Sequence, residues 1–297
     1  MELDEIDHHQ ADGVVEIVLD RPEKLNAISA RAGGTRDQIL DVLTRAEADH
    51  SVGAVLLHGR GRAFSVGGDL TGNEPRETET EHRVFLERAE VLHRRLRDSR
   101  LPIVAAVHGH CLGAALALVA SCDFVLAATT ASFALPEGRL GLVGASPLVP
   151  IVGRQWAKFM VLTGEPIGAA LARELGLVLS VEPDDELVPR GRDLARRLAR
   201  LPREAVALNK RAVDAVADAS GDAAGRDAGL AHDAATLTAG ARAQAPDGRT
   251  FREILAAEGV DGLKRARAQQ YVDPWLGARP APSAASADEV EREGEGR

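Results

Sequence analysis

The alternation of short apolar runs with helix-spaced segments constrains the fold of this chain more than any other feature. GVVEIVLDRP (13–22) and VGAVLLHGRG (52–61) are rich in β-branched residues and close with turn residues, as strands do. Between them, Ile39, Leu40 and Leu43 are spaced as on one face of a helix. The order then repeats, with EHRVFLERAEVLHRRLRDSR as helix, PIVAAVHG as strand, CLGAALALVAS as buried helix and CDFVLAAT as strand. This alternation predicts a layered α/β core.

The second half of the chain has a helical pattern in place of the strand–helix alternation. From about Gly153 onward the strand pattern disappears and we expect helix to follow helix. We predict a core over residues 1–200 and a helical C-terminal region over 201–276. Residues 277–297 are rich in Pro, Ala, Ser and Glu without an aromatic residue, which predicts a disordered tail.

Composition narrows the class of protein. The formal net charge of −9 argues against nucleic acid as the main partner, because phosphate-binding surfaces are basic. Two cysteines, Cys111 and Cys122, give no disulfide framework, and neither CxxC nor HExxH occurs, so we expect no metal site. No apolar signal core and no run of 18 apolar residues is present, so we expect a cytoplasmic protein without a membrane segment.

Two segments place glycines where a buried strand ends. GRAFSVGGDL (61–70) would let the backbone approach a ligand closely, and its Asp69 is expected to cap the following turn. In GHCLGAALAL, the amides of Leu112, Gly113 and Ala114 are expected to point out of a helix N-terminus toward an anion or a developing oxyanion. The alternative is that the small residues only allow close helix packing.

A third segment, ASFALPEGRLGL, holds an acidic residue in an apolar run. Glu137 is either solvated on a loop or faces a pocket, where burial would raise its pKa and suit it to proton transfer.

These segments follow one another in an order that resembles the crotonase superfamily, also called the enoyl-CoA hydratase/isomerase family. The matching motifs are RPEKLNAI (21–28), GRAFSVGGDL, AAVHGHCLGAALALVASCD (105–123), FALPEGRLGL (133–142) and MVLTGEPIGAALARELGLV (160–178), with a weaker echo at AEGVDGLKRAR (257–267). The resemblance implies a spiral of ββα units and a helical C-terminal region that builds a homotrimer or hexamer.

The resemblance also implies a catalytic arrangement. The backbone amides of Gly68 and Ala114 would bind the oxygen of an acyl-CoA thioester and stabilise the enolate formed from it. Coenzyme A is then part of the substrate, and no separate cofactor is expected. Residues implied along the coenzyme are Lys24, Leu25 and Ala27, with the adenine near Val66, Asp69 and Leu70. Lys264 or Arg267 would reach the coenzyme phosphates from the same or a neighbouring subunit, although a solvated helix face explains both equally well.

One departure from the family pattern guides the choice of reaction. Hydratases of the family use two glutamates, and here the helix position is Ala117 while the loop position keeps Glu137. One carboxylate can move a proton between two carbons, so we predict double-bond isomerisation with Glu137 as the shuttle base. Hydration stays open if Asp69, Ser146 or Glu165 replaces the missing carboxylate. The loop between Glu137 and Gly153 is also shorter than is typical, which affects the acyl pocket.

Two other classes fit parts of the sequence. GHCLG matches a nucleophile elbow, which would make Cys111 the nucleophile of an α/β-hydrolase, with His232 as the histidine downstream. A non-catalytic member that binds acyl-CoA would explain Ala117 and the short loop. The first reading leaves GRAFSVGGDL unexplained, and the second leaves Glu137 without a role.

Overall fold

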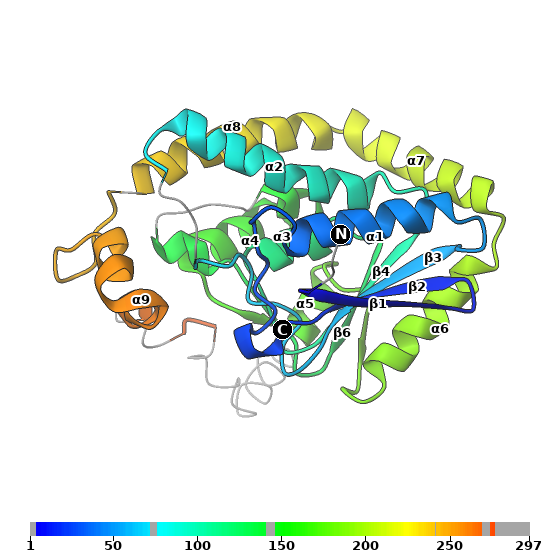
Figure 1. Ribbon diagram of the computed structural model, residues 1–297. Helices are drawn as coiled ribbons and strands as arrows, with labels where there is room; N and C mark the ends of the chain where they lie inside the picture. Colours follow the sequence, from blue (N-terminus) through cyan, green and yellow to red (C-terminus); the bar gives the residue numbers. More distant parts are fainter. Residues whose placement is uncertain (1–3, 72–75, 141–145, 241, 269–273, 277–297) are drawn as a thin grey trace, which may run out of the picture.

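The computed structural model describes residues 4–71, 76–140, 146–240, 242–268 and 274–276 (Figure 1). The predicted disordered tail, 277–297, lies outside the described residues.

The main sheet of this part of the chain has the strand order β1-β2-β3-β4-β6-β9. β1 (Ile6–Ala11) and β2 (Val14–Leu19) form an antiparallel hairpin. The remaining strands run parallel to β2, and they are β3 (Ala54–Gly59), β4 (Ile103–Val107), β6 (Phe124–Ala128) and β9 (Ser180–Glu182). The predicted α/β core is therefore confirmed.

A small second sheet lies beyond the carboxyl end of β4. It joins β5 (His110–Leu112), β7 (Ser132–Ala134) and β8 (Ile167–Gly168), with β5 parallel to β7 and β7 antiparallel to β8. Leu112 pairs with Ala134, so the segments that follow β5 and β7 leave the sheet side by side.

Helices cover both faces of the main sheet (Figure 1). One face packs mainly against α1 (Thr35–Ala48), α2 (Glu79–Arg97), α3 (Ala114–Val119) and α4 (Val149–Thr163), and the other against α6 (Leu187–Ala199). Strands covered on both sides read as continuous apolar runs, and every residue of β4 is 0% exposed. On α1, Ile39, Val42, Leu43 and Ala46 form the buried stripe, at the spacing of one helix face.

The C-terminal helices form an outer layer. α7 (Arg203–Ala219) leads into α8 (Asp222–Gly240), which lies along α2 (Figure 1). α9 (Phe251–Ala268) is interrupted at Gly259 (φ 67°) and packs against the 3₁₀ turn η2 (Pro136–Leu140). The other short elements are η1 (Pro22–Lys24), η3 (Ser146–Leu148) and α5 (Ala169–Glu174). Within the described ranges, no helix is long and apolar enough to span a membrane.

Two sequence-based expectations about the elements were wrong. Strands do not end at Gly153, because β8 and β9 follow; both are very short, and their pairing with distant strands defines them more than their own residues do. The predicted buried helix was expected to start at Cys111, but Cys111 and Leu112 belong to strand β5, and the helix begins at Ala114. Helix α8 lies within the predicted helical C-terminal region, although its Ala- and Gly-rich sequence carries little apolar periodicity.

Candidate active site

The loop that follows β3 is held against the start of α3. Ser65 forms a bridge with Cys111, in which its amide donates to His110 O (2.9 Å) and its carbonyl accepts from Leu112 N (3.1 Å). Gly67 has φ +90°, and a Cβ there would lie 2.5 Å from Leu112 O. Glycine at 67 therefore allows the loop and the helix to approach this closely.

The backbone amides of Gly68 and Ala114 have no hydrogen-bond partner among the described residues. Gly68 is fixed from both sides, because Ile28 N donates to Gly67 O (2.7 Å) and Asp69 N donates to Ile28 O (2.9 Å). A Cβ built on Gly68 would meet nothing within 4 Å. The expectation that Leu112 and Gly113 also present free amides was wrong, since their amides bond to Ser65 O and Ala134 O.

The carboxylate of Glu137 lies at the first turn of α3. Gly113 precedes that helix with φ 54°, and a Cβ added there would overlap the Glu137 carboxylate, with Oε1 the nearest atom. The arrangement follows from the second sheet, because β5 and β7 pair side by side and each leads directly to one of these residues. Arg139 Nε donates to Thr163 O (2.6 Å) and anchors η2 to α4. Glu137 is therefore buried against the start of α3 and does not face bulk solvent.

Burial sets the protonation behaviour of Glu137. Its Oε2 is buried and has no hydrogen-bond partner in the part of the chain that the structure describes. Burial raises the pKa of this carboxyl to about 7, and its own backbone amide and the Arg267 guanidinium offset part of the rise. A carboxyl with a pKa near neutrality can both accept and return a proton at physiological pH.

The position one turn further along α3 is apolar. Ala117 donates its amide to Gly113 O (3.2 Å) and adds no polar side-chain atom to the site. Asp69 bonds to Arg21 and to Thr71, and Glu165 accepts from Trp275 N (3.0 Å) and Leu276 N (3.1 Å). The side chain of Ser146 lies outside the described residues. Two of the candidates for the missing second carboxylate are therefore engaged elsewhere.

The residues expected along the coenzyme come together in the structure. Val66 N donates to Leu25 O (3.1 Å), Lys24 Nζ lies 3.8 Å from Asp69 Oδ2, and Ala27 precedes the Ile28–Gly68 bridge. Leu70 is 43% exposed and continues the same loop. Their contact with coenzyme A stays a prediction. Asp69 accepts from Thr71 N (2.9 Å) and Oγ1, which confirms the predicted turn cap.

The two basic residues of α9 differ in position. Lys264 is exposed and lies 3.6 Å from Asp261, one turn earlier in the helix. Arg267 is half-buried, and its charge acts on Glu137 and on Arg139. In this chain Arg267 is therefore near the carboxylate of the same subunit, a placement that the sequence did not indicate. The role of Lys264 toward the coenzyme phosphates stays a prediction.

Arg21 links the coenzyme side of the site to the loop that carries Gly68, and sequence reasoning did not single it out. Its Nη1 donates to Ala27 O (2.7 Å) and its Nη2 to Asp69 Oδ2 (2.9 Å), and its side chain is only 11% exposed. The signal was present in the motif RPEKLNAI, but the partner of the arginine lies 48 residues away.

Arg21→Met is expected to loosen the loop that carries Gly68. Removing a buried charged donor costs about 2 kcal/mol of stability, and if the Gly68 amide is the predicted oxyanion donor, a small displacement of it lowers kcat by about tenfold or more. Thermal unfolding and steady-state kinetics test this. Arg60→Met is the control, because Arg60 forms more exposed ion pairs with Asp7 and Asp20 and should leave kcat unchanged. An unaltered kcat in Arg21→Met would show that Arg21 does not position the loop.

The structure does not support the nucleophile-elbow interpretation. Cys111 lies on strand β5 with a fully buried side chain, and burial raises the pKa of its thiol, which disfavours the reactive thiolate. His232 is exposed on α8 and bonds to Ala228 O (2.8 Å). A buried cysteine in a strand is a packing residue.

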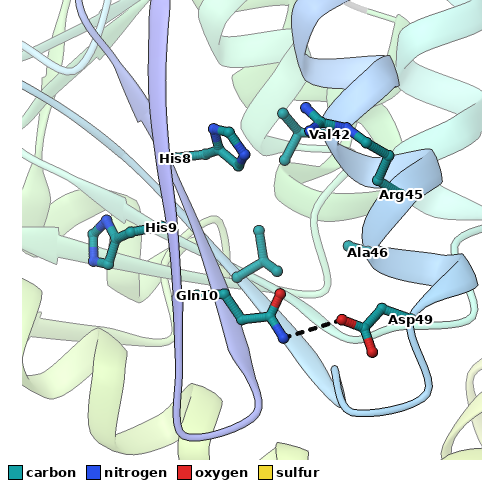
Figure 2. Close-up of a pocket in the computed structure, with 8 residues that line it drawn as sticks. His8, His9, Gln10, Val42, Arg45, Ala46 and Asp49 are labelled. Carbon is teal, nitrogen blue, oxygen red and sulfur yellow. Dashed lines mark hydrogen bonds between the residues drawn. The ribbon is translucent and has the colours of Figure 1, made fainter.

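A hollow of about 300 Å³ lies elsewhere, between β1 and α1 (Figure 2). Figure 2 shows His8 and Gln10 on the side of β1 that faces α1, with Gln10 Nε2 donating to Asp49 Oδ2 (3.2 Å). The hollow lies near the turn of the β1–β2 hairpin, whereas Gly68 follows the opposite end of β3. The hollow is therefore not part of the candidate active site.

Comparison with known proteins agrees with this geometry. The family described as enoyl-CoA hydratase/isomerase matches residues 9–239. A rat protein named enoyl-CoA hydratase domain-containing protein 3, mitochondrial, is 38% identical over 208 residues, which are 68% of this chain and 67% of the rat protein. The 1,2-epoxyphenylacetyl-CoA isomerase of Escherichia coli is 32% identical over 213 residues, covering 69% of this chain and 80% of that enzyme.

A solved structure extends the similarity to the fold. The crystal structure of an enoyl-CoA hydratase/isomerase from Xanthobacter autotrophicus has a TM-score of 0.83 and 30% identity, covering 91% of this chain and 99% of that one. The two-sheet α/β core with its C-terminal helices is thus the crotonase fold, the class of protein that the sequence motifs predicted. Within that class, the chain belongs to the enoyl-CoA hydratase/isomerase family and is an acyl-CoA enzyme.

Proposed function

We propose that the protein moves a carbon–carbon double bond in an enoyl-CoA, converting a 3-enoyl thioester to the 2-enoyl isomer. One observation carries the proposal: among the described residues, the buried carboxyl that lies against the start of α3 is that of Glu137, and the position one turn further on is Ala117. The E. coli relative is named as an isomerase, which agrees with this proposal. Other relatives are named as hydratases, so hydration is the alternative function.

The mechanism needs one base and one anion site. Ionised Glu137 takes a proton from the carbon next to the thioester carbonyl, and the electron pair moves onto the carbonyl oxygen to give a dienolate. The amides of Gly68 and Ala114 donate to that oxygen, and one such donor contributes about 3 kcal/mol to the transition state. Protonated Glu137 then returns the same proton to the far carbon of the dienolate, so no water and no second acid is consumed.

Hydration would require a second polar group to hold and activate water. Ala117 offers a methyl group there, and the carboxylates of Asp69 and Glu165 are occupied by other partners. Hydration, which needs two acid–base groups, is therefore less well supported than isomerisation, in which Glu137 alone carries the proton.

The test is to add purified protein to 3-hexenoyl-CoA and follow the absorbance of the conjugated product, with loss of crotonyl-CoA absorbance as the parallel assay. Isomerisation predicts a rise in the first assay and little change in the second. Rapid loss of crotonyl-CoA would show hydration and disprove the shuttle. Binding of both thioesters without turnover would identify a non-catalytic acyl-CoA-binding protein.

The Arg267 cation is expected to set the acidic limb of the pH profile. Because the base must be ionised, kcat/KM should rise with pH through about 7 and level off above it. Arg267→Gln removes a charge that lowers the pKa of Glu137, so the limb should move to higher pH. Lys264→Gln, on the same helix but exposed, should leave the profile in place. An unchanged limb in Arg267→Gln would mean that this contact does not tune the base.

A further inference from the structure

A buried carboxylate, that of Glu165, binds the last described residues of the chain. Glu165 is 5% exposed and lies in the connection between α4 and β8 (164–166). Its Oε1 accepts from Trp275 N (3.0 Å), and its Oε2 accepts from Leu276 N (3.1 Å). Burying a carboxylate is costly unless hydrogen bonds satisfy it, and backbone amides do so on both oxygens here. We call this contact the C-terminal clasp, and residues 274–276 the C-terminal segment.

Apolar contacts add to the C-terminal clasp. The Trp275 ring lies 5.8 Å from the ring of Phe159 on α4, and Phe159 in turn meets Trp156 edge to face at 5.6 Å. Leu276 packs against the main hydrophobic cluster of the protein. Because hydrogen bonds and apolar contacts act on the same two adjacent residues, the C-terminal segment is held on the end of α4.

The C-terminal clasp is built on the same helix end that anchors η2. Glu165 N donates to Thr163 Oγ1 (3.1 Å), while Thr163 O accepts from Arg139 Nε of η2 (2.6 Å). The strand that follows Glu165, β8, pairs with β7, and β7 leads to Glu137. The end of α4 therefore binds both the turn that carries Glu137 and the C-terminal segment.

The C-terminal clasp also restrains the end of α9. This helix is broken at Gly259, where φ is 67°, and Arg267 lies near its last residue. Seven positions separate Arg267 from Pro274, a length of chain that extends to at most about 25 Å. With the clasp closed, two contacts hold the end of α9: its packing on η2 and the chain that leads to Trp275.

Arg267 is the cation that acts on Glu137 from another element. Burial raises the pKa of Glu137, and its own backbone amide and the Arg267 guanidinium offset part of the rise. Of the other charged groups around it, Arg139 on η2 acts on Arg267, and Arg154 and Lys158 on α4 are exposed. Helix α3 carries no charged residue. The position of Arg267 therefore controls the charge that the proposed base experiences.

We propose that Glu165 is a positioning residue for the acid–base reaction. By holding the C-terminal segment on the end of α4, it keeps Arg267 beside Glu137. The inference rests on the proposed role of Glu137 and adds a residue that acts through another one. When the C-terminal clasp opens, Arg267 can move away, and Glu137 is then less ionised at neutral pH because a favourable charge is lost.

The first measurement is hydrogen exchange of the C-terminal segment, followed by mass spectrometry. In the native protein the amides of Trp275 and Leu276 are bonded to Glu165 and should exchange slowly. Glu165→Ala removes both acceptors, so the peptide that contains these amides should exchange about tenfold or more faster.

The second measurement is the pKa of Glu137, taken from the infrared carboxyl band that is lost in the matched Glu137→Gln proteins. Glu165→Ala should move this pKa to higher pH by about one pH unit, as Arg267→Gln does, because both changes withdraw the same cation. The double variant should show the shift of Arg267→Gln alone. At pH 9, where Glu137 is ionised in each variant, kcat should change little.

Asp49→Ala is the matched control. The Asp49 carboxylate accepts from Ser51 N (2.8 Å) and Gln10 Nε2 (3.2 Å) beside the hollow of Figure 2. Its loss should leave the exchange of the C-terminal segment and the pKa of Glu137 unchanged. If Glu165→Ala does not fold, Glu165→Gln is the second variant; it keeps the volume and one acceptor oxygen and should raise the pKa by less. Loss of a negative charge acting through space would lower the pKa instead, so the sign separates the two.

Three results would overturn the inference. Unchanged exchange in Glu165→Ala would show that Glu165 does not hold the C-terminal segment. Faster exchange with an unchanged pKa of Glu137 would leave Glu165 a structural role alone. A lower pKa would mean that Glu165 acts by its own charge. Failure to turn over either thioester contradicts the proposed function and is a separate outcome, because neither the exchange nor the infrared titration requires turnover.

Discussion

Glu137→Gln is expected to lower the turnover of 3-hexenoyl-CoA by about 10²–10⁴-fold, the range contributed by a general acid–base residue. Glutamine keeps the shape of the side chain but cannot carry the proton between the two carbons. The amides of Gly68 and Ala114 remain, so binding of a saturated acyl-CoA should change little. Steady-state kinetics and calorimetry measure the two effects separately. Retention of most of the activity would mean that another group is the base.

The stability of Glu137→Gln shows whether lost activity reflects lost structure. The folded-state pKa of Glu137 is raised from 4.5 to about 7, so the folded protein favours the protonated form. Stability is therefore lost as pH rises from about 4.5 to 7, by on the order of 3 kcal/mol at pH 8. Glutamine is neutral at pH 5 and at pH 8, so the variant should gain stability relative to the native protein as pH is raised between these values. A variant that is less stable at pH 8 would indicate a structural role for the carboxylate.

Gly113→Ala is expected to lower kcat by about 10²-fold or more, because one methyl disturbs two groups of the proposed mechanism. The added Cβ would overlap the Glu137 carboxylate, and alanine disfavours the positive φ of 54° that sets the start of α3. Displacing Glu137 and the Ala114 amide by about 1 Å is enough for a loss of this size. Activity with 3-hexenoyl-CoA and the pH profile measure the effect.

Gly248→Ala separates backbone strain from the clash in the site. Gly248 also has a positive φ, 84°, but a Cβ there would meet nothing within 4 Å. It should cost a similar amount of stability and leave kcat unchanged. Equal losses of activity in both variants would show that strain, and not contact with Glu137, accounts for the effect of Gly113→Ala.

Much of the candidate site could be predicted because its residues occur in local patterns. Gly68 follows a strand in a glycine-rich loop, Ala114 begins a helix of small residues, and Glu137 stands out as an acid in an apolar run. Only their order along the chain carried the family resemblance, and the structure brings the three together. The free amides at 112 and 113 were predicted wrongly, because their acceptors, Ser65 O and Ala134 O, belong to distant segments.

The sequence by itself determined the α/β core, the family and the presence of one acidic residue where two are usual in hydratases, because these depend on periodicity and on motifs read within a few tens of residues. Only the tertiary structure decided that Gly113 lies against Glu137, that Arg267 of α9 acts on that carboxyl, and that Glu165 binds the amides of the C-terminal segment. These contacts join residues that are far apart in the chain. Their geometry follows from how sheets and helices pack, and no local pattern encodes it.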